Sequence, residues 1–447
     1  MAGRRIDVEA LIDGQRLGAF PIRVLVLALL ALIIEGYDVQ IMSFAAPSLL
    51  KAWHLQRAAF GPVLSAGLLG ILFGALIFGW IGDRVGRKPC IVISSVLYGL
   101  FGLCLLLAHD LNTLVGLRFL AGLGMGGVVP NAIAIAAELA PKRMRAGMAG
   151  FIGVGITIGG IVPGLVVAQL PPGPVFHQLF LIGGLAPLVL AAIIALGLPE
   201  SIAFLVQRGG SKARIAGLAN QIDPSLKATA DDDFVLPQRP AGERVGFAAL
   251  FAGELGLVTP LLWLMFAASL LSLFMLTSWM PLLLEASGFT ARDAAATNSL
   301  FQIGGAISGV VVGLLLGRLG PRLPLAMFVL ALVTVAIAAR APLSNEALAA
   351  VIAVAGFCVT GIQCSLNGTA GLAYPTSVRS RGLGACLGVG RIGAVVGPLV
   401  AGAMVASGIS SARDLFLLPL LPLAVATLAA FVVVRRLDLK RAPGATA

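Results

Sequence analysis

Four ionisable side chains stand inside long apolar stretches of this sequence, at Glu35, Asp38, Arg118 and Arg391. A charge in a hydrocarbon layer is costly, so residues of this kind are expected to move protons or to bind a charged ligand. Glu35 and Asp38 are three residues apart and therefore share one face of a helix. Two carboxylates this close resist ionising together, which suits a proton carrier.

Arg391 differs because the half of the sequence that contains it has no carboxylate in the middle of an apolar run. The planar guanidinium group fits a carboxylate through two parallel hydrogen bonds. We therefore interpret Arg391 as the residue that binds an anionic ligand. Hydrogen bonding to backbone carbonyls or to water is the alternative.

Two pairs of amide side chains complete the candidate set. Asn298 and Gln302 are four residues apart, as are Gln363 and Asn367, so each pair lies on one helix face. Such a pair can bond the hydroxyl or carboxylate groups of a ligand. Hydrogen bonding between helices is an alternative of equal weight.

Membrane helices must position these residues, and the composition indicates such helices. Hydrophobic residues make up 59% of the 447 residues and charged residues only 11%, whereas soluble domains carry about 25% charged residues. A membrane helix needs about 20 apolar residues. Twelve continuous runs of this kind lie near residues 22–48, 60–81, 89–108, 111–138, 145–170, 176–199, 258–286, 292–317, 323–341, 345–373, 381–408 and 412–434.

The runs form two sets of six around a polar stretch. We therefore predict an all-α integral membrane protein with six-helix bundles at 22–199 and 258–434. A linker at 200–257, with room for one amphipathic helix, joins the bundles. Polar segments at 1–21 and 435–447 flank them.

The basic residues predict how the chain is oriented in the membrane. With the N-terminus inside, 24 of the 31 Lys and Arg residues fall in inner segments and 5 in outer loops. Basic loops stay in the cytoplasm, so both termini and the linker are expected there. The net charge of +11 is explained by this topology. Without a basic folded domain, nucleic-acid binding is not expected.

The two halves repeat each other at an offset of 234 residues. The loop at 79–88 corresponds to the loop at 313–322, and Arg145 corresponds to Arg379. The six-span halves share one orientation, so they are parallel repeats. Transporters built from such repeats bind their substrate between the halves, near the midplane of the bilayer.

The segment Gly79 to Lys88, GWIGDRVGRK, resembles the loop 2–3 signature of the major facilitator superfamily. Within that superfamily the chain is similar to the aromatic acid:proton symporters. The similar segments are EGYD at 35–38, the stretch from Arg118 to Asn131, and GVGRIG at 388–393. Glu35 stands where that family usually has Asp.

The resemblance implies that spans 1 and 4 line a central cavity, with Arg118 opposite the two carboxylates. Glu35, Asp38 and Arg118 are then the proton-coupling residues, and a static ion pair that only fixes packing is the alternative. Arg118 also joins the residues expected to bind substrate, which are Arg391, Tyr37, Asn131, Asn298, Gln302, Gln363 and Asn367.

The resemblance also implies a gate at the cytoplasmic ends of spans 2 and 3. Asp83 is expected to accept hydrogen bonds from a facing helix N-terminus. Arg84, Arg87, Glu138 and Arg145 are expected to join this network. The alternative, that the basic residues only determine topology, does not account for Asp83.

We therefore expect a proton-coupled importer of an aromatic carboxylate, such as benzoate or a hydroxybenzoate, in a bacterial inner membrane. Protons and lipids are its other expected partners, and it is expected to work as a monomer. The alternatives are a transporter of a non-aromatic acid such as muconate, a proton-driven exporter and, more remotely, a transporter-like receptor. The sequence has no catalytic set, nucleotide motif or metal-ligand spacing, so neither an enzyme nor a cofactor is expected.

Overall fold

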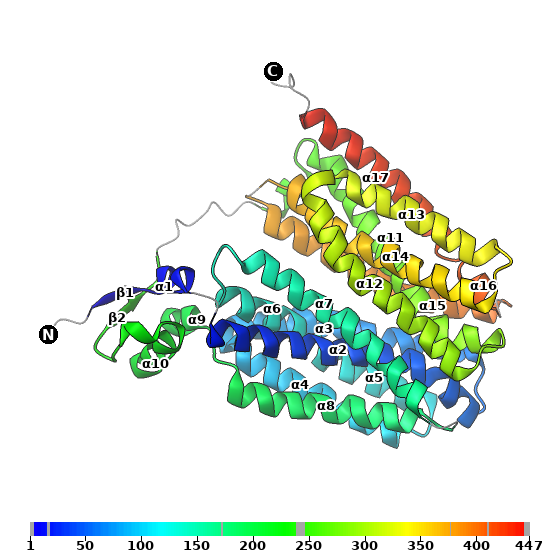
Figure 1. Ribbon diagram of the computed structural model, residues 1–447, viewed down its shortest axis with the longest axis horizontal. Coiled ribbons are helices and arrows are strands. Elements are labelled where there is room, and N and C mark those ends of the chain that lie inside the picture. The colour runs from blue at the N-terminus through cyan, green and yellow to red at the C-terminus, as the bar shows by residue number, and fades with distance from the viewer. Residues whose placement is uncertain are drawn as a thin grey trace. The chain divides into compact units, whose positions relative to one another are not determined.

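The computed structural model describes residues 4–15, 18–170, 173–237, 246–375, 377–408 and 411–441. In this part of the chain, twelve helical spans are long and apolar enough to cross a membrane. They confirm the prediction of twelve membrane helices, and Figure 1 shows them as long rods. Residues 238–245 of the predicted linker and the predicted tail beyond residue 441 lie outside the described residues.

Several spans consist of two consecutive helical pieces. In the first half of the sequence the spans are α2 (Ala19–Ala52), η1 (Arg57–Phe60) with α3 (Gly61–Val85), α4 (Arg87–Cys104) with η2 (Leu105–Leu107), α5 (Leu111–Met125) with α6 (Val128–Glu138), α7 (Arg145–Gln169) and α8 (Phe176–Gly197). In the second half they are α11 (Leu255–Ala286), α12 (Ala291–Leu319), α13 (Arg322–Arg340), α14 (Asn345–Ala373), α15 (Arg379–Ala406) and α16 (Ala412–Leu415) followed by α17 (Leu420–Arg441).

Span 4 is interrupted between α5 and α6, at Gly126 and Gly127. Pro130 has no N–H to donate to the carbonyl of Gly126, so one bond of the helical ladder is missing. A Cβ at Gly126 would collide with the α3 backbone, and a Cβ at Gly127 would collide with Phe78 of α3. The interruption therefore lies where glycine lets this span approach α3 closely.

The N-terminal segment and the linker fold together. Strand β1 (Arg5–Asp7) pairs in parallel with β2 (Asp233–Val235), and α1 (Val8–Gly14) follows β1. The linker also contains α9 (Ile202–Gln207), α10 (Lys212–Ile222), η3 (Pro224–Leu226) and η4 (Phe247–Phe251). The fold is thus mostly rather than wholly helical, and the described part of the linker holds two α-helices instead of one. Strands of three residues are too short to produce a sequence pattern, and their partners lie far apart in the chain.

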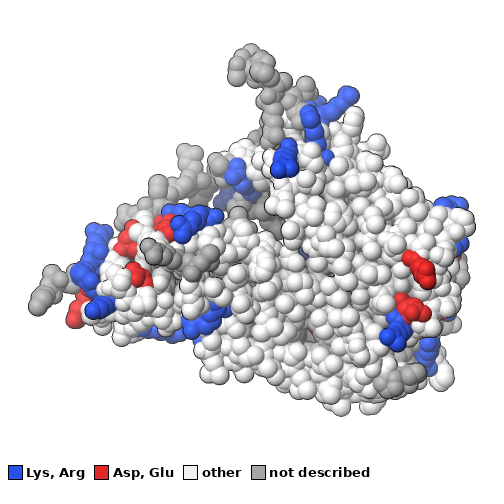
Figure 2. All heavy atoms as spheres, in the orientation of Figure 1, with Lys and Arg blue, Asp and Glu red and all other residues white. Residues whose placement is uncertain are grey.

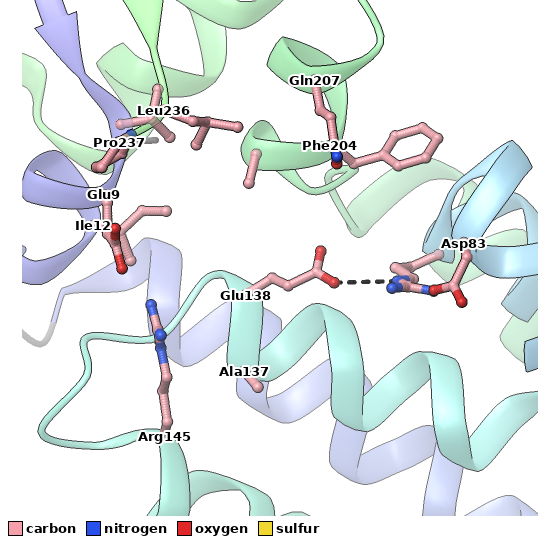
Figure 3. Close-up of a pocket in the computed structure, with 13 residues that line it drawn as sticks. Glu9, Ile12, Asp83, Ala137, Glu138, Arg145, Phe204, Gln207, Leu236 and Pro237 are labelled. Carbon is pink, nitrogen blue, oxygen red and sulfur yellow. Dashed lines mark hydrogen bonds and ion pairs between the residues drawn. The ribbon is translucent and has the colours of Figure 1, made fainter. Parts of the chain in front are cut away.

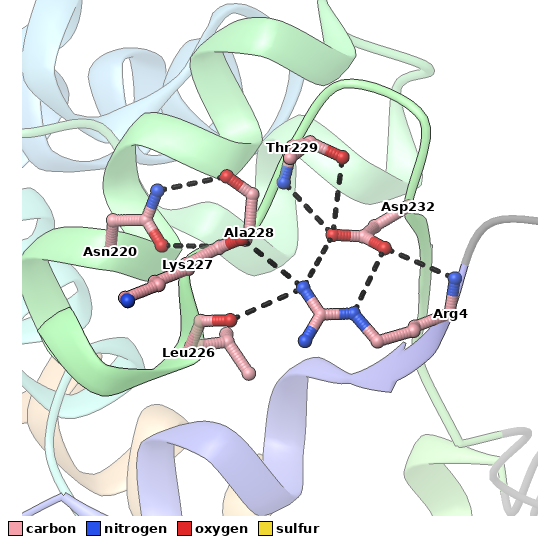
Figure 4. Close-up of polar contacts among 7 residues, drawn as sticks. All are labelled: Arg4, Asn220, Leu226, Lys227, Ala228, Thr229 and Asp232. Atoms are coloured by element: carbon pink, nitrogen blue, oxygen red, sulfur yellow. Dashed lines mark hydrogen bonds and ion pairs between the residues drawn. The ribbon is translucent and has the colours of Figure 1, made fainter.

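Arg4 attaches β1 to the linker (Figure 4). Its Nη2 lies 3.1 Å from Oδ2 of Asp232, and its backbone N–H donates to Oδ1 of the same residue at 3.0 Å. The guanidinium also donates to the carbonyls of Leu226 and Lys227 at 3.2 Å. The hydrogen bond from Arg4 lowers the pKa of the Asp232 carboxyl to about 2.

The chain forms two compact units. The first comprises residues 1–36, 70–156 and 181–242, and the second comprises residues 37–69, 157–180 and 243–447. Their boundaries cross α2, α3, α7 and α8. The second unit therefore combines the second half of the sequence with one end of each of these four helices. The boundaries of the two six-helix bundles stay a prediction.

Equivalent contacts recur in the two halves at the offset of 234 residues. Gly70 of α3 lies against the carbonyl of Phe119 in α5, and Gly304 of α12 lies against the carbonyl of Ala353 in α14. At both glycines a Cβ would collide with the neighbouring backbone. The same close helix pair is therefore built once in each unit.

Two further details repeat at the same spacing. Arg145 and Arg379 each donate through Nε to the carbonyl five residues earlier, at 3.1 and 3.3 Å. Asp110 and Ser344 each cap a helix by accepting a hydrogen bond from the backbone N–H three residues later. These contacts support the parallel repeat that the sequence indicates.

Figure 2 shows how charge is distributed over one face of the molecule. Charged side chains gather over β1, β2, α9 and α10, whereas the surface over the long helices is nearly uncharged. Large apolar side chains point outward from these helices, with Leu196 91% and Leu314 74% exposed. Such a surface is suited to lipid.

Candidate functional site

The two carboxylates of α2 are buried. Glu35 is 4% and Asp38 is 2% exposed, and Arg118 in α5 is 4% exposed. Gly36 separates the two acids in the sequence, and a Cβ at this position would collide with the carbonyl of Ile156 in α7. Glycine therefore lets α2 approach α7 beside Glu35. All three ionisable groups lie inside membrane spans, as predicted from the sequence.

Two of the predicted substrate contacts are bonded to helix backbone. The hydroxyl of Tyr37 donates to the carbonyl of Leu179 in α8 at 3.0 Å. The Nδ2 of Asn131 donates to the carbonyls of Phe78 and Gly127 at 3.1 and 2.8 Å, so Asn131 joins α6 to α3. These bonds hold both side chains in defined orientations, and their roles in substrate binding stay predictions.

Asn298 is fully buried in α12. Among the described residues, neither its Oδ1 nor its Nδ2 has a hydrogen-bond partner. A buried polar group without a partner costs about 1–3 kcal/mol. The unmade bonds of Asn298 therefore leave one donor group and one acceptor to be satisfied by a ligand or by water.

Gln302 is one helical turn beyond Asn298 and lies beside α7. The position that a Cβ of Gly160 would occupy is bordered by the amide of Gln302 and by the side chain of Gln40 from α2. Gln40 thus belongs to the same polar group, although it is not among the residues predicted from the sequence. A glutamine two residues after Asp38 within an apolar run was the available signal.

The second amide pair behaves differently. Nε2 of Gln363 in α14 donates to Oγ of Ser269 in α11, which is the inter-helix bond given as the alternative interpretation. Asn367 is exposed, and Arg391 in α15 is half-buried. Within the described chain, no hydrogen bond links Gln363 or Asn367 to Asn298.

The second unit also holds together helices from both halves of the sequence. Ser299 of α12 donates to the carbonyl of Ile161 in α7 at 3.4 Å, and Ser65 of α3 donates to the carbonyl of Val395 in α15 at 2.8 Å. Gly164 of α7 faces the Ser299 hydroxyl so closely that a Cβ would collide with it. These contacts close one end of α3 and α7 against α15 and α12.

An ion pair lies at the same end of these helices. Nζ of Lys51, at the end of α2, is 3.0 Å from Oε2 of Glu285, at the end of α11. The two residues are 234 positions apart, which is the repeat offset. They are therefore equivalent positions of the two halves that carry opposite charges.

Four of the five predicted gate residues line one pocket of about 830 Å³ in the first unit (Figure 3). Asp83, Arg87, Glu138 and Arg145 all line it. Arg87 pairs with Oδ1 of Asp83 at 2.5 Å and with Oε1 of Glu138 at 3.2 Å. In Figure 3, Arg145 points toward Glu9 of α1.

Arg84, the fifth predicted gate residue, does not line this pocket. Its guanidinium stacks over the ring of Trp80, 3.5 Å from the ring centre. Four of the five predicted gate residues therefore line one pocket, whereas Arg84 lies at the outer surface of α3, where Trp80 is exposed.

Glu200, which is not among the residues predicted from the sequence, holds the N-terminus of α4. Its carboxylate accepts backbone hydrogen bonds from Arg87 at 3.2 Å and from Lys88 at 3.3 Å. Burial raises the pKa of Glu200, although these N–H groups and that of Ser201 act in the opposite direction. The helix dipole favours a negative charge at this place. A lone carboxylate directly after an apolar run was the only sequence signal.

A family profile described as Major Facilitator Superfamily matches residues 28–398. The chain belongs to the major facilitator superfamily. It is therefore a transporter and not an enzyme, and its twelve apolar spans make it a multi-pass inner-membrane protein.

Relatives along nearly the whole chain carry names of aromatic acid transporters. The chain is 36% identical over 431 residues to the 4-hydroxybenzoate transporter PcaK of Pseudomonas putida, covering 96% of each chain. It is 35% identical to the gallate transporter of Pseudomonas putida, covering 90% of each. It is 31% identical to the benzoate transport protein of Acinetobacter baylyi, covering 89% of this chain and 86% of that one.

Solved structures share the fold. The chain is similar to the xylose transporter XylE from E. coli in a partially occluded inward open conformation, with a TM-score of 0.72 at 14% identity. That match covers 94% of this chain and 98% of the other. Identity this low supports the fold and carries nothing about the substrate.

Proposed function

We propose that this protein imports an aromatic carboxylate of the benzoate or hydroxybenzoate class by proton symport. The observation that carries proton coupling is the burial of Glu35 and Asp38 one helical turn apart in a membrane helix. The names of the relatives, for 4-hydroxybenzoate, gallate and benzoate, support the substrate class.

In this proposal Asp38 and Glu35 receive the proton. Two buried carboxylates on one helix face repel each other when both are ionised, and protonation of one removes that cost. Arg118 is the counter-ion of the ionised pair. Loading a proton releases Arg118 from this role and makes it available to the anionic substrate.

Most of the residues assigned here to substrate recognition lie in the second half of the sequence. Arg391 binds the carboxylate through its guanidinium group. Asn298, whose amide has no partner among the described residues, supplies a donor and an acceptor for a ring hydroxyl or the carboxylate. Gln302 lies one turn away on the same helix face, and Tyr37 contributes its ring.

The ends of the helices act as gates. The pocket that contains Asp83, Arg87 and Glu138 is the cytoplasmic gate, and the basic loops around it favour that side of the membrane. The Lys51–Glu285 ion pair belongs to the opposite, outer gate. The two six-helix halves rock around the loaded substrate, and one chain suffices for the cycle.

Uptake into proteoliposomes tests the proposal. With an acidic exterior, the protein should accumulate labelled 4-hydroxybenzoate, and unlabelled benzoate should compete more strongly than muconate. Glu346→Gln, which changes an exposed carboxylate at the start of α14, is the control for the acid variants. Uptake that ignores the pH gradient, export under it, or binding without flux would each contradict the proposal.

A further inference from the structure

A second cavity in the first unit lies between the start of α4 and the linker. It has a volume of about 350 Å³ and is lined by Lys88 of α4, Arg214 of α10 and Glu200, together with apolar residues. None of the predicted substrate or gate residues lines it. The proposed transport cycle therefore makes no use of it.

The cavity presents positive charge. Lys88 and Arg214 are close enough to repel each other electrostatically. Within the described residues, neither cationic head group has a carboxylate within 4 Å. The Glu200 carboxylate in the same wall is engaged by the backbone N–H groups of α4. Glu200 also attracts Lys88 and offsets part of the positive charge, but the two cations outnumber this one carboxylate and favour an anionic ligand.

Apolar residues place this cavity at the edge of the membrane. Val85 and Ile93, which also line it, are 54% and 47% exposed. Trp80, five residues before Val85 in α3, is 60% exposed and carries the stacked guanidinium of Arg84. Exposed Trp with a basic neighbour is typical of the interface between the bilayer and water.

We propose that this cavity binds the phosphate headgroup of an anionic phospholipid, with Lys88 and Arg214 on the phosphate and the acyl chains over Val85 and Ile93. Basic pockets beside membrane helices are suited to such headgroups. The apolar rim distinguishes a lipid from free phosphate, which gains nothing from exposed aliphatic side chains. A bound lipid would hold α10 of the linker against the membrane end of α4.

Lipid binding to the purified full-length protein tests this proposal. Delipidated protein in neutral detergent is titrated with phosphatidylglycerol or with phosphatidylcholine, and bound lipids are counted by native mass spectrometry. Phosphatidylglycerol should bind at least about five-fold more tightly. Arg214→Gln should weaken its binding about five-fold, the effect of one basic residue at a membrane surface. Arg214→Lys should retain it.

Arg208→Gln is the matched control, because Arg208 is an exposed cation of the same linker that does not line the cavity. It should leave phosphatidylglycerol binding unchanged. Equal binding of the two lipids, or equal losses in Arg208→Gln and Arg214→Gln, would overturn the proposal. Inorganic phosphate that displaces phosphatidylglycerol at millimolar concentration would show a free-phosphate site instead and would also overturn it.

Discussion

Protonation of Asp38 is expected to affect transport more than protonation of any other residue. Asp38→Asn imitates the protonated carboxyl in size and charge, so no proton can be loaded or released there. Accumulation driven by a pH gradient should therefore be lost, while exchange of labelled for unlabelled substrate should persist. Glu35→Gln should be milder if Glu35 only assists its neighbour. The measurement is uptake and exchange in proteoliposomes, with and without the gradient. Native accumulation by Asp38→Asn would transfer the coupling role to Glu35.

Arg391 is expected to determine the affinity for the substrate. A charged hydrogen bond to a ligand carboxylate contributes about 1.5–3 kcal/mol, so Arg391→Ala should weaken substrate binding by about ten-fold or more. Arg391→Lys should recover little, because the two parallel bonds of the guanidinium are lost. Calorimetric titration with 4-hydroxybenzoate measures both variants, and thermal unfolding checks that they fold. Affinity close to the native value in Arg391→Ala would refute the assignment.

At the level of helices, Asp83 is expected to act in the movement of the gate and not in substrate recognition. Asp83 pairs with Arg87, four residues later in the chain, and Arg87 in turn pairs with Glu138 of α6. Asp83→Asn removes the charge that orients Arg87 and should slow uptake sharply. Substrate affinity should stay within about three-fold, because no substrate contact is lost. Binding and uptake are compared with those of Glu346→Gln, and normal uptake would leave Asp83 as a topology residue.

The ion pair between the ends of α2 and α11 is expected to contribute little to uptake. Lys51 is 76% exposed at the side chain and Glu285 15%, and exposed pairs contribute about 0–1 kcal/mol. Glu285→Gln should therefore change the uptake rate by less than about five-fold. Glu285→Lys places two cations opposite each other and should therefore change the uptake rate more. The exchanged pair Lys51→Glu with Glu285→Lys should restore uptake. Failure of the exchanged pair to do so would separate these residues from the gate.

For the whole molecule, the attachment of the N-terminus to the linker is expected to depend on pH. The pKa of Asp232 is about 2 in the folded protein against an ordinary value of 3.8. Ionised Asp232 therefore stabilises the attachment above pH 3.8, and this contribution is lost as the pH falls toward 2.

Hydrogen exchange of residues 5–7 measures this attachment. Exchange should accelerate over that acid range after correction for intrinsic rates. At neutral pH, Arg4→Ala should accelerate it several-fold, because Arg4 joins β1 to Asp232. Lys212→Ala, which breaks the exposed pair with Asp233, is the control and should have little effect. Equal exchange in native protein and Arg4→Ala would remove Arg4 as the anchor.

The sequence by itself determined the twelve spans, the repeat and the candidate ionisable residues. A span needs about 20 apolar residues in a row, which is a local property of the chain. A buried charge such as Asp38 is also visible locally, because its apolar neighbours are adjacent in the sequence. The repeat is a comparison of the sequence with itself, and the contacts of Gly70 and Gly304 show it again in the fold.

Only the tertiary structure decided which polar groups meet. Gln363 bonds Ser269, whereas Asn298, a residue of the same chemical class, has no partner in the described chain. Glu200 caps a helix that begins 113 residues before it, and β1 pairs with a strand more than 220 residues away. Hydropathy predicts that a helix lies in the membrane, but it does not predict which neighbouring helix each face contacts. Those contacts depend on helix packing at the ångström scale, where a single glycine decides how closely two backbones approach.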